Sequence, residues 1–237
     1  MKKISSVVVV VVFCMQTLYA QYETRPRLVE ASFFGGPTVM WASPKTKSYK
    51  NEGARIGGVY GVGVDINMVQ PLQNYYFSTG LHARHIRSAM SFKDNYHIAH
   101  TDSILNDKFV RSGYNMIYVS IPTAIKLKTD PIGSFIIFGV VGMDNSFCVS
   151  SKRSDDIENQ SNYGKIDMYQ HTLFFREALL ASVGFEFIIK GNTKASFELA
   201  FNNGFTNIFK KKYINNLTKD PVVANTRGFE FQFGFVF

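Results

Sequence analysis

The last ten residues of the chain, "GFEFQFGFVF", alternate between apolar and other side chains. Phenylalanine stands at every odd position from Phe229 to Phe237, and the even positions hold glutamate, glutamine, glycine and valine. A period of two is typical of a β-strand whose two faces meet different surroundings. The final stretch is therefore predicted to be a strand with one strongly apolar face.

The same period recurs along most of the chain. Each repeat has about 9 or more residues, the length that a tilted strand needs to cross a membrane. No stretch of similar length has a convincing helical period, and no second domain is evident. The pattern predicts an all-β fold of about eight strands, at residues 31–41, 55–68, 75–86, 115–128, 135–147, 179–189, 195–203 and 228–237.

The connections between these strands alternate in length. The short ones, 70–74, 128–133 and 190–194, contain the Pro, Gly and Asn of tight turns. The long ones are 42–53, 91–113, 150–170 and 210–227. Outer-membrane barrels have short periplasmic turns and longer extracellular loops. The rhythm predicts an eight-stranded, antiparallel, up-and-down transmembrane β-barrel in the outer membrane of a Gram-negative bacterium.

A soluble lipocalin barrel fits the same alternation with the faces reversed. The distribution of small residues favours the membrane barrel. An eight-stranded interior is only just wide enough for side chains, and Phe from every strand would overfill it. We therefore expect the bulky residues to face lipid and the opposite face to line the lumen. That opposite face carries Gly57, Gly61, Gly63, Gly80, Gly184 and Gly234.

The predicted inner face also carries charges of both signs. No Lys or Arg interrupts the middle of an apolar face, where it would cost about 2–4 kcal/mol in lipid. Buried charges must be paired or they destabilise the fold. We expect a network of ion pairs that plugs the lumen, formed by Arg55, Asp65, Arg84, Lys126, Glu186, Glu198 and Glu230.

The N-terminal stretch has the pattern of a secretory signal peptide. Lys2 and Lys3 precede an apolar run from Val7 to Met15, and Ala20 offers a cleavage site. The run is too short for a transmembrane helix. We assign residues 1–20 to the leader, 21–30 to a short periplasmic segment and 31–237 to the barrel. Cleavage would leave Cys148 as the only cysteine, so no internal disulfide is expected.

Composition and charge narrow the possible partners. The chain has 22 Phe and 12 Tyr, only 19% charged residues and a formal charge of +8. A basic charge alone would suggest nucleic acid as a partner. The predicted leader excludes it, because an exported protein does not meet nucleic acid. Outer-membrane lipid or lipopolysaccharide phosphate is the remaining target for basic loops. Simple solubility of scattered lysines is the other interpretation.

Several motifs resemble those of the PorT-like family of outer-membrane β-barrel proteins. They are "YVSIPTAIKLKT" with its Ile121-Pro122 pair, "FIIFGVVGMDNSF", "ASVGFEFII", "NNGFTNIF" from Asn202 and "TRGFEFQFGFVF". The resemblance implies an outer-membrane barrel. It also implies a link to type IX protein secretion, with secretion-system proteins as partners, because founding members are implicated in that process. Most members have no assigned activity. The resemblance further implies that Phe237 is the C-terminal signal that the barrel-insertion machinery reads.

The sequence offers little for catalysis, and no cofactor, catalytic residue or metal ligand is assigned. Three groups of residues are candidates for chemistry. His97, His100 and Asp102 in "HIAHTD" have the types of side chain that bind a metal, and Asp155, Asp156 and Glu158 could bind a cation. His85 with Ser88 could belong to a lipid-acting enzyme. For the group in "HIAHTD" and the group at 155–158, the simpler interpretation is a solvated loop without a bound ion. We expect a non-enzymatic barrel with a structural or partner-binding role. The alternatives are a small diffusion channel and a lipid-modifying enzyme.

Overall fold

The computed structural model describes residues 27–70, 72–97, 104–157, 160–215 and 217–237. The predicted leader and residues 21–26 lie outside this part of the chain. Within it, no helix is long and apolar enough to cross a membrane. The strands are β1 (Val29–Pro44), β2 (Tyr49–Asn67), β3 (Tyr75–His97), β4 (Ile104–Lys128), β5 (Phe135–Ile157), β6 (Gln160–Asp167), β7 (Phe175–Lys190), β8 (Thr193–Gly204) and β9 (Ala224–Val236).

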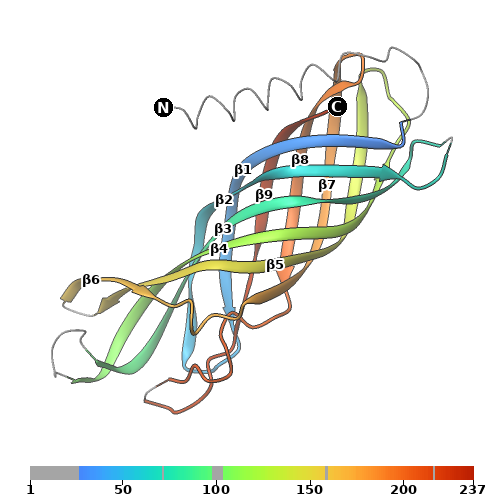
Figure 1. Ribbon diagram of the computed structural model, residues 1–237. Helices are drawn as coiled ribbons and strands as arrows, with labels where there is room; N and C mark the ends of the chain where they lie inside the picture. The colour runs from blue at the N-terminus through green and yellow to red at the C-terminus, as the bar shows by residue number, and fades with distance from the viewer. Residues whose placement is uncertain (1–26, 71, 98–103, 158–159, 216) are drawn as a thin grey trace, which may run out of the picture.

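Eight of these strands close into one antiparallel barrel (Figure 1). Each barrel strand pairs with the next one along the chain, with β5 pairing directly with β7, and β1 pairs with β9 to close the ring. Strand β6 pairs only with the end of β5 and adds a short extension outside the ring. The predicted eight-stranded up-and-down barrel is therefore confirmed.

One end of the barrel has short connections and both described ends of the chain. The turns there are 68–74, 129–134 and 191–192, and Gly133 and Gly191 supply the positive φ that two of them need. Phe237 is held to Ala31 by backbone hydrogen bonds of 2.9 and 3.3 Å. This end corresponds to the periplasmic side of an outer-membrane barrel.

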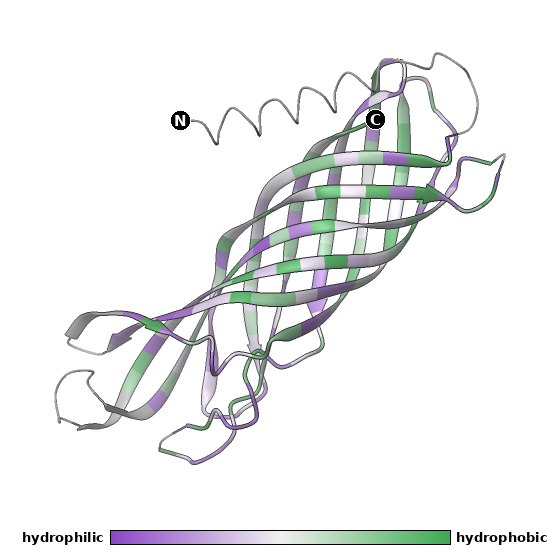
Figure 2. Cartoon of the chain, viewed as in Figure 1, coloured by the Kyte–Doolittle hydropathy of each residue, from purple (hydrophilic) through white to green (hydrophobic). Residues whose placement is uncertain are grey.

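The two faces of the strands have the predicted orientation. Phe231, Phe233 and Phe235 are 41–50% exposed on the outer wall, whereas Glu230 and Gln232 are buried in the lumen. Figure 2 shows the resulting alternation of apolar and polar residues along the strands. Phenylalanines of neighbouring strands contact one another outside the barrel, for example Phe185 and Phe197 at 5.0 Å between ring centres. The lipocalin alternative, with its apolar face inward, is wrong.

At the other end, most of the residues expected in long loops belong to strands, and among the described residues only the connection 205–223 is a long loop. The expected loops at 91–113 and 150–170 instead extend β3, β4 and β5 and add β6, which project beyond the barrel in Figure 1. The expected loop at 42–53 shrinks to 45–48. The inner faces of these extensions stay buried, as at Phe92 and Val110, but their outer faces carry exposed charges such as Arg111 and Lys152. The contrast between an apolar outer face and a small or polar inner face is therefore lost from the sequence. The connection 205–223 is a long irregular loop, held by bridges that include Ile214 with Pro221.

The lumen differs between the two halves of the barrel. The periplasmic half is lined by small and charged residues, as expected. The extracellular half holds an apolar core that the sequence did not predict, and the 205–223 loop contributes to it: Phe209 packs on Tyr114 with 5.4 Å between ring centres. This apolar plug consists of Met40, Ala42, Tyr49, Ile86, Met90, Phe92, Val110, Tyr114, Met116, Tyr118, Cys148, Met168, Ile208, Phe209, Val222 and Ala224.

The barrel begins earlier than predicted. Strand β1 starts at Val29 and not at residue 31, and Glu30 points into the lumen. The sequence placed Glu30 in a periplasmic segment because a single charged residue at a strand end carries no periodic signal. Its partners, Lys128 and Lys194, come from β4 and β8.

Candidate functional site

The periplasmic half of the lumen holds a compact group of six charged side chains from five strands. Glu186 is at its centre and is fully buried. Its carboxylate lies 3.1 Å from the Nζ of Lys126 and 2.8 Å from that of Lys128 and that of Lys194. Three acids face three lysines, so the charges balance. We call this group the lower cluster: Glu30, Asp65, Lys126, Lys128, Glu186 and Lys194.

The three carboxylates of the lower cluster lie close enough to share a cation. One oxygen each from Glu30, Asp65 and Glu186 lies within 4.8 Å of the others. Each carboxylate, however, already contacts at least one lysine ammonium, and Lys126 reaches Asp65 at 2.8 Å. The ammonium groups occupy the positions that a metal ion would need and supply its charge. The cluster is best described as a structural crosslink between strands.

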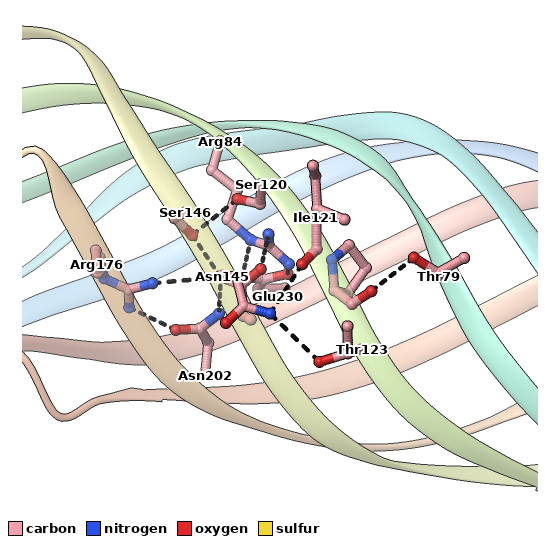
Figure 3. Close-up of polar contacts among 12 residues, drawn as sticks. Thr79, Arg84, Ser120, Ile121, Thr123, Asn145, Ser146, Arg176, Asn202 and Glu230 are labelled. Atoms are coloured by element: carbon pink, nitrogen blue, oxygen red, sulfur yellow. Dashed lines mark hydrogen bonds and ion pairs between the residues drawn. The ribbon is translucent and has the colours of Figure 1, made fainter.

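A second balanced group lies further up the lumen. Arg84 donates to both carboxylate oxygens of Glu230 at 2.9 and 3.3 Å, and its Nη1 lies 2.6 Å from Asp144. The other oxygen of Asp144 lies 3.3 Å from Arg176. Asn202 and Ser146 also donate to Asp144. Figure 3 shows Arg84, Arg176 and Glu230 converging from different strands, together with Ser146 and Asn202. Arg84, Asp144, Arg176 and Glu230 form the middle cluster.

Both clusters are almost completely buried. Arg84 is 1% exposed, and Asp144 and Glu230 are 0% exposed. Taking such charges out of water costs several kcal/mol per ion, which is offset only when geometry and hydrogen bonds are good. The bidentate contact of Arg84 and the extra donors to Asp144 meet that condition. Each cluster joins strands that are far apart in the barrel wall, so the lumen is crossed by charge pairs at two levels.

Five of the seven residues predicted for the lumen network lie in these clusters. Asp65, Lys126 and Glu186 belong to the lower cluster, while Arg84 and Glu230 belong to the middle one. The sequence interpretation missed five members, although alternation along the strands could have found Lys128 and Asp144. The missed residues are Glu30, Lys128, Asp144, Arg176 and Lys194.

Glu198 faces the lumen but lies between the clusters. It lines a cavity of about 60 Å³ together with His82, Asp65 and Lys126. Among the described residues it has no ion-pair partner within 4 Å, in contrast to the predicted role. The cavity has room for a few water molecules, and these are suited to solvating the carboxylate.

Arg55 was wrongly assigned to the lumen network. It is exposed near the extracellular end of β2, where it lines a surface groove with Glu52, Arg87 and Arg111. The pairing of β2 with β3 shifts register on both sides of Ala54. On its other side Arg55 directly opposes Met40 of the apolar plug, so it keeps the inner side of β2, but it lies at the extracellular rim and is not a member of either cluster.

The structure does not assemble the other candidate chemistry. His85 lies on the outer wall and stacks on Tyr60, whereas Ser88 is buried on the inner side of β3. The two residues are three apart on one strand and therefore point to opposite faces. Asp155 is held by Arg153 at 2.8 Å and by Ser112 at 2.6 Å. His100, Asp102 and Glu158 lie outside the described residues.

The match to a family of known proteins extends over most of this barrel. The family model "Outer membrane protein beta-barrel domain" matches residues 19–210. The chain belongs to this family. The protein is therefore located in the outer membrane of a Gram-negative bacterium, as its family and its closed barrel both indicate. Among curated proteins, none matches the chain.

Solved structures with a similar fold come from several bacteria. Neisserial surface protein A is 13% identical, covers 88% of this chain and 94% of its own, and has a TM-score of 0.42. OprG from Pseudomonas aeruginosa is 10% identical, with coverage of 90% and 98% and a TM-score of 0.44. The outer membrane protease OmpT from Escherichia coli is 10% identical, with coverage of 92% and 99% and a TM-score of 0.43.

Proposed function

We propose that this family member is a non-enzymatic outer-membrane protein that acts through its surface and not through its lumen. The observation that carries the proposal is the filled interior. Two charge-balanced clusters and the apolar plug succeed one another along the lumen, and the cavity beside Glu198 is only about 60 Å³. The candidate catalytic pair is also separated, because His85 lies on the outer wall and Ser88 on the inner side of the same strand. The surface that remains for function includes the extended strands β3 to β6 and the 205–223 loop.

A closed lumen predicts that the purified protein will not conduct ions in a planar bilayer. Ions would have to pass the lower cluster, the middle cluster and the apolar plug, each packed with side chains. An eight-stranded barrel leaves no spare cross-section beside them. We expect no stable current steps above the baseline at moderate voltage. Regular, reproducible conductance steps from the folded barrel would instead favour a small diffusion channel.

The resemblance to PorT-like proteins supports a finer proposal about the partner. We propose that the partner is a component of type IX protein secretion and that it binds the extracellular side. The 205–223 loop offers a suitable surface, because Ile214 and Leu217 are 45% and 37% exposed beside several lysines. Exposed apolar side chains rimmed by polar ones are typical of protein-binding surfaces.

Affinity capture from mild detergent tests this proposal. The tagged wild type should retain type IX secretion subunits, identified by mass spectrometry, while the variant Ile214→Ser/Leu217→Ser should lose most of them because the apolar contact is removed. The matched control is Leu72→Ser/Ile132→Ser, which removes two similarly exposed apolar residues from periplasmic turns. Equal recovery from both variants, or no type IX subunit above that of an unrelated barrel, would contradict the proposal.

The C-terminal residue supports a proposal about assembly. Phe237 directly follows the last strand, is held to Ala31 by backbone hydrogen bonds and stacks on Phe33 with 5.7 Å between ring centres. It lies at the seam between β1 and β9, the pairing that closes the barrel. We propose that the barrel-insertion machinery reads Phe237 as its C-terminal signal.

A further inference from the structure

A row of polar side chains crosses the outer wall of the barrel on β3, β4 and β5. Arg87 directly opposes Asn115, and Asn115 directly opposes Lys152. Directly opposed residues in an antiparallel pair point to the same face. Arg87 and Lys152 are exposed, while the neighbouring Ile86 and Ser151 are buried. The row therefore faces outward, with its two cations about 10 Å apart across the strands.

The height of this row places it at the edge of the membrane. Tyr75 marks the periplasmic end of β3. From there to Arg87 the strand covers about 40 Å, or about 30 Å along the barrel axis at the usual tilt. The lipid-facing apolar band of such barrels is about 25 Å tall. Arg87 thus lies just beyond the hydrocarbon, at the level of the headgroups of the outer leaflet. Lys152 lies further out on the same side, since 17 residues separate it from the periplasmic start of β5 at Phe135.

The residues below the row suit acyl chains. Tyr60 and His85 stack on each other one step closer to the periplasm, with 5.9 Å between ring centres. Further down, Leu81, Val62 and Ile121 are 45–53% exposed on the same wall. Aromatic rings at the interface and aliphatic side chains beneath them match the polarity of a lipid from its headgroup to its tails.

The surroundings of the row carry more positive than negative charge. Arg55, Arg111 and Lys165 line the open groove next to Arg87. The nearby acids are Glu52, which lies 3.6 Å from Arg111, Asp156 beside Arg111, and Asp167 opposite Lys152. Asp155 in the same groove is already paired with Arg153. When Arg87 and Lys152 are counted with the groove, this surface has five cationic side chains. It has three acidic ones, because Asp155 is not counted.

Asn115 gives a second indication of a ligand. Its side-chain oxygen is buried and has no hydrogen-bond partner among the described residues. A buried acceptor without a partner costs free energy, and this one lies between two cations on a face that meets lipid. The side chain as a whole is only half-buried, and its rotation would bring this oxygen to a hydroxyl or amide donor on a lipid headgroup.

We propose that Arg87, Asn115, Lys152 and Arg111 form a binding site for the phosphorylated headgroup of lipopolysaccharide. The guanidinium groups and the ammonium bind the phosphates, Asn115 accepts from the sugar portion, and the acyl chains lie on the apolar wall below. Arginine suits this task because its planar donors match phosphate oxygens in pairs. The site lies on the lateral wall, where a lipid is the adjacent molecule, and it is independent of any protein partner.

Lipid retention by the full-length barrel in detergent tests the site. The probe is bisphosphorylated lipid A, and native mass spectrometry measures the bound fraction. We expect the variant Arg87→Gln/Arg111→Gln/Lys152→Gln to bind it roughly tenfold or more weakly, since three charge-assisted contacts are lost. The control Lys210→Gln/Lys211→Gln/Lys212→Gln removes the same charge from the extracellular loop and should bind as the wild type does. The heat-dependent gel mobility of each variant shows that it is folded.

Two further arms need only the wild-type protein. Lipid A stripped of its phosphates should bind as weakly as the native lipid binds to the triple variant, and a large excess of inorganic phosphate should not displace the native lipid. Equal binding of stripped and native lipid A would overturn the proposal. Equal loss in the loop control would do so as well, because it would show a general effect of charge. Displacement by inorganic phosphate would identify a site for free anions instead of lipid.

Discussion

Replacing Arg84 with methionine should destabilise the folded barrel by about 3–5 kcal/mol, the range expected when one partner of a buried ion pair is removed. The substitution leaves Glu230 without its bidentate donor and Asp144 with Arg176 as its remaining cation. Both carboxylates are 0% exposed, so water cannot replace the lost contacts. Urea unfolding of the barrel in detergent or lipid vesicles, followed by tryptophan fluorescence and gel mobility, would measure the change.

Two control variants separate the charge effect from the loss of side-chain volume. Arg84→Met/Glu230→Met removes a cation and an anion together, leaving Asp144 paired with Arg176, and should be clearly more stable than the single variant. Arg87→Met removes an exposed arginine three residues further along the same strand and should change stability by less than about 0.5 kcal/mol. A single Arg84 variant as stable as the Arg87 variant would show that the middle cluster does not hold the barrel together.

Replacing Phe237 with alanine should reduce the amount of barrel in the outer membrane several-fold. The expected cause is recognition during assembly and not a loss of stability. In the folded barrel the half-buried Phe237 ring contacts Phe33, while the backbone hydrogen bonds of Phe237 to Ala31 do not depend on the side chain. Quantitative immunoblotting of outer-membrane fractions would measure the effect in cells.

The matched control for Phe237→Ala is Phe235→Ala. Phe235 is also a lipid-facing ring on β9 and also contacts Phe33, at 5.4 Å between ring centres. Both variants should refold equally well from urea into detergent, where no insertion machinery is present. If Phe235→Ala lowered the amount in cells as much as Phe237→Ala, or if Phe237→Ala alone failed to refold in vitro, the ring would be structural and not a signal.

The wall of the barrel was predictable from the sequence because its determinants are local. The alternation from Phe229 to Phe237 reports that one face meets hydrocarbon and the other does not, and the position of Glu230 on the inner face follows from the same pattern. The short turns also follow from local chemistry, since residues such as Gly191 must adopt a positive φ there. A membrane imposes these patterns strongly, because a charge in the apolar band is costly at every strand.

The contents of the lumen were only partly predictable. Alternation gave the inward side for Lys126 and Glu186 but could not pair them, because ion-pair partners come from strands that are distant in sequence. Lys194 and Glu30, for example, are 164 residues apart. The apolar plug was missed because its strand residues, such as Met116 and Tyr118, are apolar on the face that was expected to be polar, and because Phe209 comes from an irregular loop with no periodic spacing. Arg55 was misassigned because alternation gives the side of a strand but not the distance to a partner: it opposes Met40 on the inner side but lies exposed near the extracellular end of β2.

The sequence by itself therefore determined the number of barrel strands, the short periplasmic turns and the face that most barrel residues present to lipid or lumen. These depend on the period of two and on turn chemistry, which act over a few residues. Only the tertiary structure decided which charges pair, how the extracellular half of the lumen is filled and which cations meet on the outer wall. Those features depend on the stagger between strands when the barrel closes, a long-range quantity that no local pattern encodes.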